Sequence, residues 1–335
     1  MLVPVIVIEE PSTRTADEHE SCPNNFDEKA SYRPYETERS GVCVLKGTMN
    51  SQQAGMPTAL QAAAVIRETT CRTVLNRSTV SDYSLNCYTG CAHGCVYCYA
   101  RFMQRFHPHA ESWGGFVDVK VNAVEALERQ LRRARPGNVF MSSACDGWQP
   151  VEGDRRLTRT CAALLLEHEF RVNVLTKSPL VLRDLDVFAG RNATIGATVT
   201  TLDEALRKLW EPRAGSVEER SRIIKEAHAA GLETSVMFGP LLPFLSDDQN
   251  SVNALFEWAA DLDVDVIWVD GLNPRPKVWE SVRDLLDRQF PGLGERYRRV
   301  LFSAPVRTAY LRGLRERVAV AAQKAHMADR LAGCP

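Results

Sequence analysis

The sequence predicts an α/β fold, a partial (β/α)6 TIM-like barrel with a flexible N-terminal arm and a helical C-terminal region. Between residues 75 and 275, short segments of strand character alternate with segments of helical periodicity. This alternation is typical of βαβ units around a parallel sheet. About six strand segments occur, fewer than the eight of a complete barrel. Polar residues follow each apolar strand segment, at the end where such barrels carry their chemistry.

The individual elements follow from local pattern. We expect strands at residues 80–85, 139–143, 172–176, 194–200, 234–238 and 264–269, and helices at 96–106, 123–134, 161–168, 180–188, 216–230 and 246–262. Residues 80–85 alternate polar and apolar side chains, which is typical of a short strand. Ser216 with Glu219 three residues later forms a capping box at the start of its helix, and Gly231 ends that helix.

Two flanking regions complete the predicted domain organisation. Residues 1–74 form an arm that we expect to be poorly ordered or loosely packed, because residues 9–40 are acidic, polar and interrupted by prolines. A short helix could form within the arm at residues 56–66. The barrel occupies residues 75–275, and residues 276–335 are expected to be helical to the end of the sequence.

Composition narrows the class of protein. The formal net charge is −1 and hydrophobic residues make up 44%, so a sizeable core is expected and no whole-chain argument for nucleic-acid binding follows. No apolar run approaches the roughly 20 residues that span a bilayer, and residues 1–8 are too short and lack the basic start of a secretory signal. We therefore expect no membrane association and a cytoplasmic location, where thiolates stay reduced.

Basic residues concentrate near the C-terminal end of the sequence. The arginines are Arg283, Arg288, Arg296, Arg298, Arg299, Arg307, Arg312, Arg315 and Arg317. They could form a surface that binds DNA, or they could be the solvated face of Arg-rich helices. The sequence favours neither interpretation.

The chemistry of the chain centres on three cysteines, Cys91, Cys95 and Cys98, spaced x3 then x2. Three thiolates so spaced can bind three irons of one [4Fe–4S] cluster, which takes four ligands when it is fully coordinated. The fourth iron is then open to the amino and carboxylate groups of a cosubstrate. The alternative is a zinc site, but zinc ribbons use two paired CxxC motifs and the chain has no second CxxC. Whether Cys22, Cys43, Cys71 or Cys87 bind a second metal stays open.

The cysteine spacing, with Tyr97 before the last cysteine, resembles the radical S-adenosylmethionine (SAM) superfamily. The match extends to further motifs and resembles the spore photoproduct lyase branch, also called DNA repair photolyase-like. These motifs are Tyr83-Ser-Leu-Asn86, Tyr88 to Arg101, Phe116 to Asn122, Thr176-Lys-Ser178, Leu209-Trp-Glu-Pro-Arg213 and Pro240-Leu-Leu-Pro243. Together they cover roughly residues 75–275.

The resemblance implies roles for individual residues. Cys91, Cys95 and Cys98 would bind the cluster, and an iron left open would bind SAM. Around SAM, Tyr97 would lie near the adenine, Ser143 or Cys145 near the amino group, Lys177 at the carboxylate, Thr198 or Thr200 at the ribose, and the backbone of Phe238 and Gly239 at the adenine. An ammonium at a strand end also suits a carboxylate on physical grounds.

Two departures from the family pattern place thiols near the expected reaction chamber. Cys87 stands where relatives carry proline, and Ala144-Cys-Asp-Gly-Trp-Gln-Pro150 replaces a Thr-Asp-Pro-Tyr-Gln-Pro motif. Cys145 and Tyr97 are the candidate catalytic residues, and Cys145 could donate a hydrogen atom to a carbon radical, as a cysteine does in spore photoproduct lyases. Cys145 could equally be a small packed side chain. Asp146, Trp148, Gln149 and Glu152 could face the substrate.

These observations predict a radical SAM enzyme of lyase or transferase type that cleaves SAM reductively and acts on a small biosynthetic molecule. The alternative substrate is a DNA or nucleotide lesion, as in spore photoproduct lyases. A third possibility, of another class, is a non-catalytic metal-binding or redox-sensing module. The enzyme would need a one-electron donor such as flavodoxin or ferredoxin. The sequence leaves open which S–C bond of SAM breaks, and it does not predict the oligomeric state.

Overall fold

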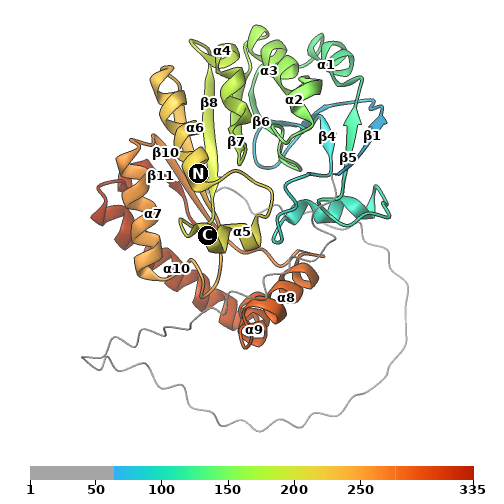
Figure 1. Cartoon of the computed structure of the whole chain (residues 1–335). Helices are drawn as coiled ribbons and strands as arrows, with labels where there is room; N and C mark the ends of the chain where they lie inside the picture. The colour runs from blue at the N-terminus through green and yellow to red at the C-terminus, as the bar shows by residue number, and fades with distance from the viewer. Residues whose placement is uncertain (1–63, 276) are drawn as a thin grey trace, which may run out of the picture. The chain divides into compact units, whose positions relative to one another are not determined.

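The computed structural model of the protein describes residues 64–275 and 277–335 (Figure 1). Cys22, Cys43 and most of the helix expected at residues 56–66 lie outside the described residues. The last two residues of that expected helix, Val65 and Ile66, begin strand β1 instead.

The central sheet confirms the predicted partial barrel. Its six parallel strands are β3 (Tyr83–Leu85), β6 (Asn138–Met141), β7 (Arg171–Thr176), β8 (Ala193–Val199), β9 (Glu233–Leu241) and β10 (Val266–Gly271). Each strand pairs in parallel with the next in chain order. Their carboxyl ends therefore meet at one edge of the sheet, which is where the residues predicted to bind SAM occur.

Two further strands extend this sheet at its edges. Strand β2 (Leu75–Arg77) pairs antiparallel with β3, and strand β11 (Leu331–Gly333) pairs in parallel with β10. The prediction of helices alone after residue 276 was therefore wrong. Leu331 packs against the apolar cluster beside β10 and the strand covers an otherwise open edge, but three residues are too few to give a recognisable pattern.

A second, smaller sheet was not predicted. It consists of β1 (Val65–Thr69), β5 (Phe116–Lys120) and β4 (Tyr88–Thr89), in the order β1-β5-β4. Strand β1 pairs with β5 along its whole length. Folded structure consequently begins before residue 75, the expected start of the barrel.

The helices lie along the sheet and beyond its last parallel strand (Figure 1). They are α1 (Ala123–Leu131), α2 (Glu152–Arg155), α3 (Leu157–Glu167), α4 (Leu185–Phe188), α5 (Glu204–Trp210), α6 (Val217–Ala229), α7 (Gln249–Asp261), α8 (Val278–Gln289), α9 (Gly294–Phe302) and α10 (Ala304–Lys324). The capping box of Ser216 and Glu219 is present at the start of α6. The helix expected at residues 96–106 is a shorter 3-10 helix, Tyr99–Arg105.

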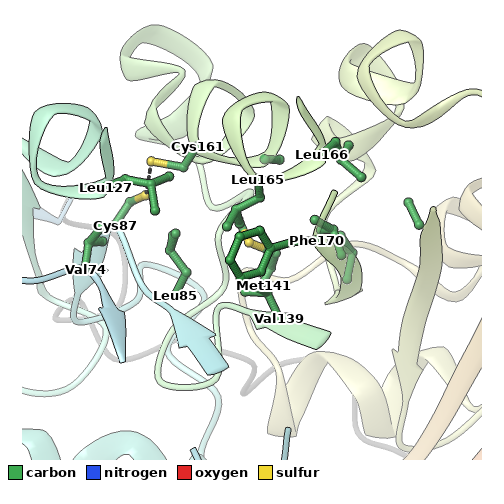
Figure 2. Close-up of a cluster of buried hydrophobic side chains, with 14 of the residues drawn as sticks. Val74, Leu85, Cys87, Leu127, Val139, Met141, Cys161, Leu165, Leu166 and Phe170 are labelled. Carbon is green, nitrogen blue, oxygen red and sulfur yellow. Dashed lines mark hydrogen bonds between the residues drawn. The ribbon is translucent and has the colours of Figure 1, made fainter. Parts of the chain in front are cut away.

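The largest apolar cluster lies between the first strands and helices α1 and α3. Figure 2 shows Leu85, Val139 and Met141 of the sheet facing Leu127 of α1 and Leu165 of α3, all of them fully buried. The same cluster holds two free thiols, Cys87 and Cys161, whose Sγ atoms lie 3.8 Å apart. A packed core beneath the first strands fixes the position of the cysteine loop that follows them.

Two side-chain amides tie the segment before β2 to helix α1. Asn122 accepts from the Cys71 N–H at 2.8 Å and donates to the Cys71 carbonyl at 2.9 Å. Gln130 accepts from the N–H groups of Val74 and Leu75 and donates to the Leu75 carbonyl. These amides supply the hydrogen bonds that a neighbouring strand would otherwise give.

In the part of the chain that the structure describes, no helix is both long enough and apolar enough to cross a bilayer.

Candidate active site

The three predicted cluster ligands lie on one loop that follows strand β4. Cys91 and Cys95 are buried and Cys98 is half-buried. The loop turns at Gly90 and Gly94, both of which have positive φ angles. Burial raises the pKa of all three thiols, that of Cys95 to about 12, and neighbouring thiols of the loop contribute to the rise at Cys91 and Cys95. The three side chains therefore lie close enough to influence one another electrostatically.

The donor set fits an iron–sulfur cube better than a single zinc ion. Zinc needs its thiolates at about 2.3 Å around one centre, and among the described residues no three Cys, His, Asp or Glu side chains gather closely enough for that. A cube separates its ligands, because each thiolate binds a different iron. The Nε atoms of Arg101 and Arg213 are buried beside these thiols without a hydrogen-bond partner in the described chain. Such donors suit the sulfurs of a cluster, whose properties depend on hydrogen bonds.

The Trp210-Glu-Pro-Arg213 segment holds the cysteine loop in place. The Val96 N–H donates to the Trp210 carbonyl at 2.9 Å, and the Arg213 guanidinium donates to the Gly114 carbonyl. Arg213 packs so closely against Gly94 and Gly114 that a side chain at either glycine would meet its Nη2 atom. Gln149 supports the other end of the loop, since its amide accepts from Ala92 N–H and donates to the Gly90 carbonyl.

Gly114 gives a direct test of this support. A Cβ there would lie 2.4 Å from Arg213 Nη2 and 2.8 Å from the Gly94 Cα, at a φ of +96°. Gly114→Ala is therefore expected to lower the free energy of unfolding by about 2 kcal/mol and to reduce the iron retained after reconstitution. Thermal unfolding and iron content measure both effects. Gly153→Ala is the matched control, because nothing lies within 4 Å of its Cβ position; equal losses in the two variants would contradict the role of Gly114.

Four of the residues predicted to bind SAM form one connected group. The Tyr97 hydroxyl donates to Glu211, and Thr200 Oγ1 lies 3.0 Å from that hydroxyl and donates to the Gly239 carbonyl at 3.1 Å. Lys177 Nζ lies 5.8 Å from the centre of the Tyr97 ring and forms no ion pair with any described residue. The group therefore contains a cation without a fixed carboxylate partner.

Glu211 is the buried centre of this group. It is fully buried and forms an ion pair with Arg220, which is also fully buried. Burial alone would raise the pKa of Glu211, but Arg220 and Lys177 bring it down to about 2. Arg220 also donates to the Thr198 carbonyl at 2.8 Å. The pair thus connects the ends of strands β8 and β9 with the cysteine loop through Tyr97.

A second connected group surrounds Asn86. Its side chain donates to Ser143 Oγ at 3.1 Å and accepts from the Ala144 N–H at 2.8 Å, and Cys145 Sγ lies 3.8 Å from its Oδ1 atom. Cys145 also packs against the apolar cluster that contains Cys91 and Trp113. Ser143 and Cys145 are therefore close to the cysteine loop.

Thr198 and Phe238 differ in the group that each can offer to a ligand. Thr198 is half-buried, and its neighbours Ala197 and Val199 pack into the core, so Thr198 faces the opposite side of the sheet. Phe238 is packed against Phe256 and Trp258, with ring centres at 5.4 and 6.3 Å. Only the backbone of Phe238 is left for a ligand, which is the contribution that was expected.

The residues expected to face substrate from the altered motif do not do so. Asp146 accepts from Thr176 Oγ1 and the Lys177 N–H, and Trp148 Nε1 donates to Asp184. Gln149 and Glu152 are fully buried; Glu152 accepts from the first N–H groups of α3 and from the Tyr88 hydroxyl. That prediction was wrong, because these polar side chains satisfy buried backbone groups.

Comparison with known proteins identifies the family of this chain. The family model described as "Radical SAM superfamily" matches residues 85–254. The chain belongs to the radical SAM superfamily. This match confirms the superfamily predicted from the cysteine spacing. Members of the family use a [4Fe–4S] cluster and SAM, the two cofactors expected for this chain. Membership favours an enzyme over a non-catalytic metal-binding or redox-sensing module.

Relatives with similar sequences carry no assigned function. An uncharacterized protein of Methanocaldococcus jannaschii is 34% identical over 168 residues, which cover 50% of this chain and 63% of that protein. An uncharacterized protein of Mycobacterium tuberculosis is 30% identical over 267 residues, covering 75% of this chain and 78% of that protein. The chain therefore spans less than two thirds of the archaeal relative.

Among solved structures, the fold resembles that of spore photoproduct lyase complexed with dinucleoside spore photoproduct. The TM-score is 0.61, and the match covers 78% of this chain and 80% of that one. Sequence identity is 12%, so this likeness shows the fold alone.

Proposed function

We propose that this protein is a radical SAM enzyme that cleaves SAM reductively and uses the resulting carbon radical on a small-molecule substrate. The observation that carries the proposal is the combination of three clustered thiols with two buried, unpartnered guanidinium Nε atoms. Lys177, placed beside Tyr97 and in ion-pair contact with no carboxylate of the described residues, supports a neighbouring site for the SAM carboxylate.

Each of the chain's own residues has a part in this proposal. Cys91, Cys95 and Cys98 would hold the cluster, which when bound supplies the electron that splits SAM into methionine and a 5′-deoxyadenosyl radical. Lys177 would bind the SAM carboxylate, and Ser143 or Cys145 its amino group. Thr198 or Thr200 would meet the ribose, while Tyr97 and the backbone of Phe238 and Gly239 would border the adenine. Held in this way, SAM is oriented for cleavage and protected from water.

Cys145 is the candidate donor of a hydrogen atom to the substrate radical. It lies beside the apolar cluster around Cys91 and next to Asn86, so its S–H group would be within the proposed chamber. In this role the S–H bond would break, a C–H bond would form on the substrate, and the unpaired electron would pass from the substrate carbon to the Cys145 sulfur as a thiyl radical.

The basic C-terminal residues give little support to a DNA substrate. Several of the nine arginines are engaged within the chain: Arg283 with Asp284, Arg298 with Glu295, Arg307 with the Leu272 carbonyl, Arg315 with the Pro335 carbonyl and Arg317 with Asp247. Partnered guanidinium groups contribute less to a field that attracts phosphates. This favours the small molecule.

A nucleotide lesion is the second candidate substrate. Phe244 is 40% exposed shortly after strand β9, and the Arg296 guanidinium lies 3.9 Å from the centre of its ring. An aromatic ring with an adjacent arginine is a platform on which nucleobases stack. Strong, salt-dependent binding of single-stranded DNA would support this candidate, and its absence at low salt would remove it.

Anaerobic reconstitution followed by addition of SAM and dithionite tests the proposed function. We expect methionine and 5′-deoxyadenosine as products. Products of a 3-amino-3-carboxypropyl radical would instead show that a different S–C bond of SAM is cleaved. A colourless, zinc-loaded protein that leaves SAM intact would overturn the proposal. A one-electron donor such as flavodoxin or ferredoxin would replace dithionite in the cell, and a reducing cytoplasm would keep the thiols available for iron.

Lys177 provides a test of the SAM site. Lys177→Ala is expected to raise the KM for SAM by about 10- to 100-fold, because a charge-assisted hydrogen bond to the carboxylate is lost, with a smaller effect on kcat. Steady-state SAM cleavage measures both constants. Lys208→Ala, an exposed lysine on α5, is the control. An unchanged KM in the Lys177 variant would show that another residue binds the carboxylate.

A further inference from the structure

A hollow lined by arginines lies between strands β2 and β3 and the end of helix α1. Its volume is about 500 Å³, which is in the range of small-molecule sites. Its lining includes Arg77, Tyr83, Arg129, Gln130, Arg133 and Arg135. Four of the lining side chains carry a positive charge and none is acidic.

The four guanidinium groups are not neutralised within the described chain. None of them forms an ion pair or a hydrogen bond with a side chain of residues 64–275 or 277–335. Asp82 interacts electrostatically with Arg77, since that arginine helps to lower the pKa of the Asp82 carboxyl. Among the described residues, the hollow therefore carries an excess of positive charge, most of it on Arg129, Arg133 and Arg135.

The floor of the hollow is rigid. The Gln130 amide makes three hydrogen bonds to the backbone of residues 74 and 75, with donor–acceptor distances of 2.6–3.0 Å. The Tyr83 hydroxyl donates to the Arg135 carbonyl at 3.1 Å, and the Arg77 guanidinium lies 4.4 Å from the centre of the Tyr83 ring. Arg77 is exposed, so the face of its guanidinium group away from the Tyr83 ring is open to a ligand.

The hollow is separate from the site of SAM cleavage. Tyr83 is the first residue of β3, and Arg135 precedes the start of β6. Both therefore lie at the amino ends of parallel strands, whereas the cysteine loop and Lys177 follow carboxyl ends. A ligand bound at the hollow would not compete with SAM.

We propose that this hollow binds an oligophosphate anion of nucleotide size. Guanidinium groups bind phosphate oxygens through paired N–H donors, so Arg129, Arg133 and Arg135 would contact the phosphates. The open face of Arg77 would stack against a planar base. A free nucleotide or one stretch of a nucleic-acid strand could supply this anion.

Titration of the reconstituted protein with ATP, inorganic tripolyphosphate and a single strand of ten thymidylates tests the proposal. We expect ATP and tripolyphosphate to bind with an affinity that falls as salt rises, and Arg129→Gln/Arg133→Gln to weaken binding by at least about 10-fold. The control is Arg132→Gln, since Arg132 is exposed on the same turn but does not line the hollow. SAM cleavage should be unchanged in all variants.

The binding of these probes distinguishes a free nucleotide from a nucleic-acid strand as the ligand. Binding of ATP but not of the oligonucleotide assigns the site to a free nucleotide, and tighter binding of the oligonucleotide assigns it to a strand. Absence of binding by all three probes would overturn the proposal. So would an equal loss of affinity in Arg132→Gln, because the attraction would then come from surface charge alone. None of these results depends on whether SAM is cleaved.

Discussion

Replacement of Cys95 by alanine is expected to lower the rate of reductive SAM cleavage by at least about 100-fold, since loss of a metal ligand should cost more than loss of its supporting contacts. Cys95 is buried, and it is the middle cysteine of the three in the loop. Iron and sulfide content, visible absorbance and 5′-deoxyadenosine yield measure the effect after anaerobic reconstitution.

Cys334→Ala is the control for this experiment. Cys334 is a free, half-buried thiol that packs against the cluster beside β10, and it is not part of the cysteine loop. Its variant should keep wild-type iron and activity. Retention of four irons per chain and full activity in Cys95→Ala would contradict the assignment of this residue as a ligand.

The second large effect is expected at Arg220, whose replacement by methionine should destabilise the protein by about 3–5 kcal/mol. The substitution leaves the Glu211 carboxylate fully buried without its partner. It also removes the donors to the carbonyls of Thr198 and Gly215. Chemical denaturation followed by far-UV circular dichroism measures the loss.

The double variant Arg220→Met/Glu211→Gln distinguishes charge burial from lost packing. It should be more stable than Arg220→Met, because no uncompensated charge remains in the core. If the double variant is equally unstable, the cost comes from lost hydrogen bonds and shape rather than from the carboxylate.

Acid pH should remove the stability that the Glu211–Arg220 ion pair contributes. In the folded protein the pKa of Glu211 is about 2, below its ordinary value, so the ionised carboxylate contributes stability above that ordinary value. The contribution is lost as the pH falls through the folded pKa. The stability difference between wild type and the double variant should therefore shrink between about pH 4.5 and pH 2.

The six parallel strands were predictable because their patterns are local. A buried strand between two helices is an apolar run in any context, so β7 and β8 were placed within one residue of their observed bounds. The small sheet was missed because β4 has two residues and β1 is exposed along its length. Neither strand shows alternation that distinguishes it from a loop.

The candidate site likewise contains residues that could be predicted from the sequence and residues that could not. The spacing of Cys91, Cys95 and Cys98 is a feature of the sequence itself, and Lys177 was assigned through the family resemblance, with its place after a strand as physical support. Glu211 and Gln149 were missed as supports of the loop, although Glu211 lies within a motif that drew attention through resemblance. A buried polar side chain can take its partner from a distant segment, as Glu211 does from Tyr97 and Gln149 from Gly90, and the local sequence pattern does not contain that information.

The amides of Asn122 and Gln130 have a consequence for local opening. Because each replaces hydrogen bonds of a missing strand neighbour for residues 71–75, that segment gains this protection only while helix α1 is folded and in place. The helix and the segment should therefore open together as one cooperative unit, slowing amide exchange at residues that otherwise border a sheet edge.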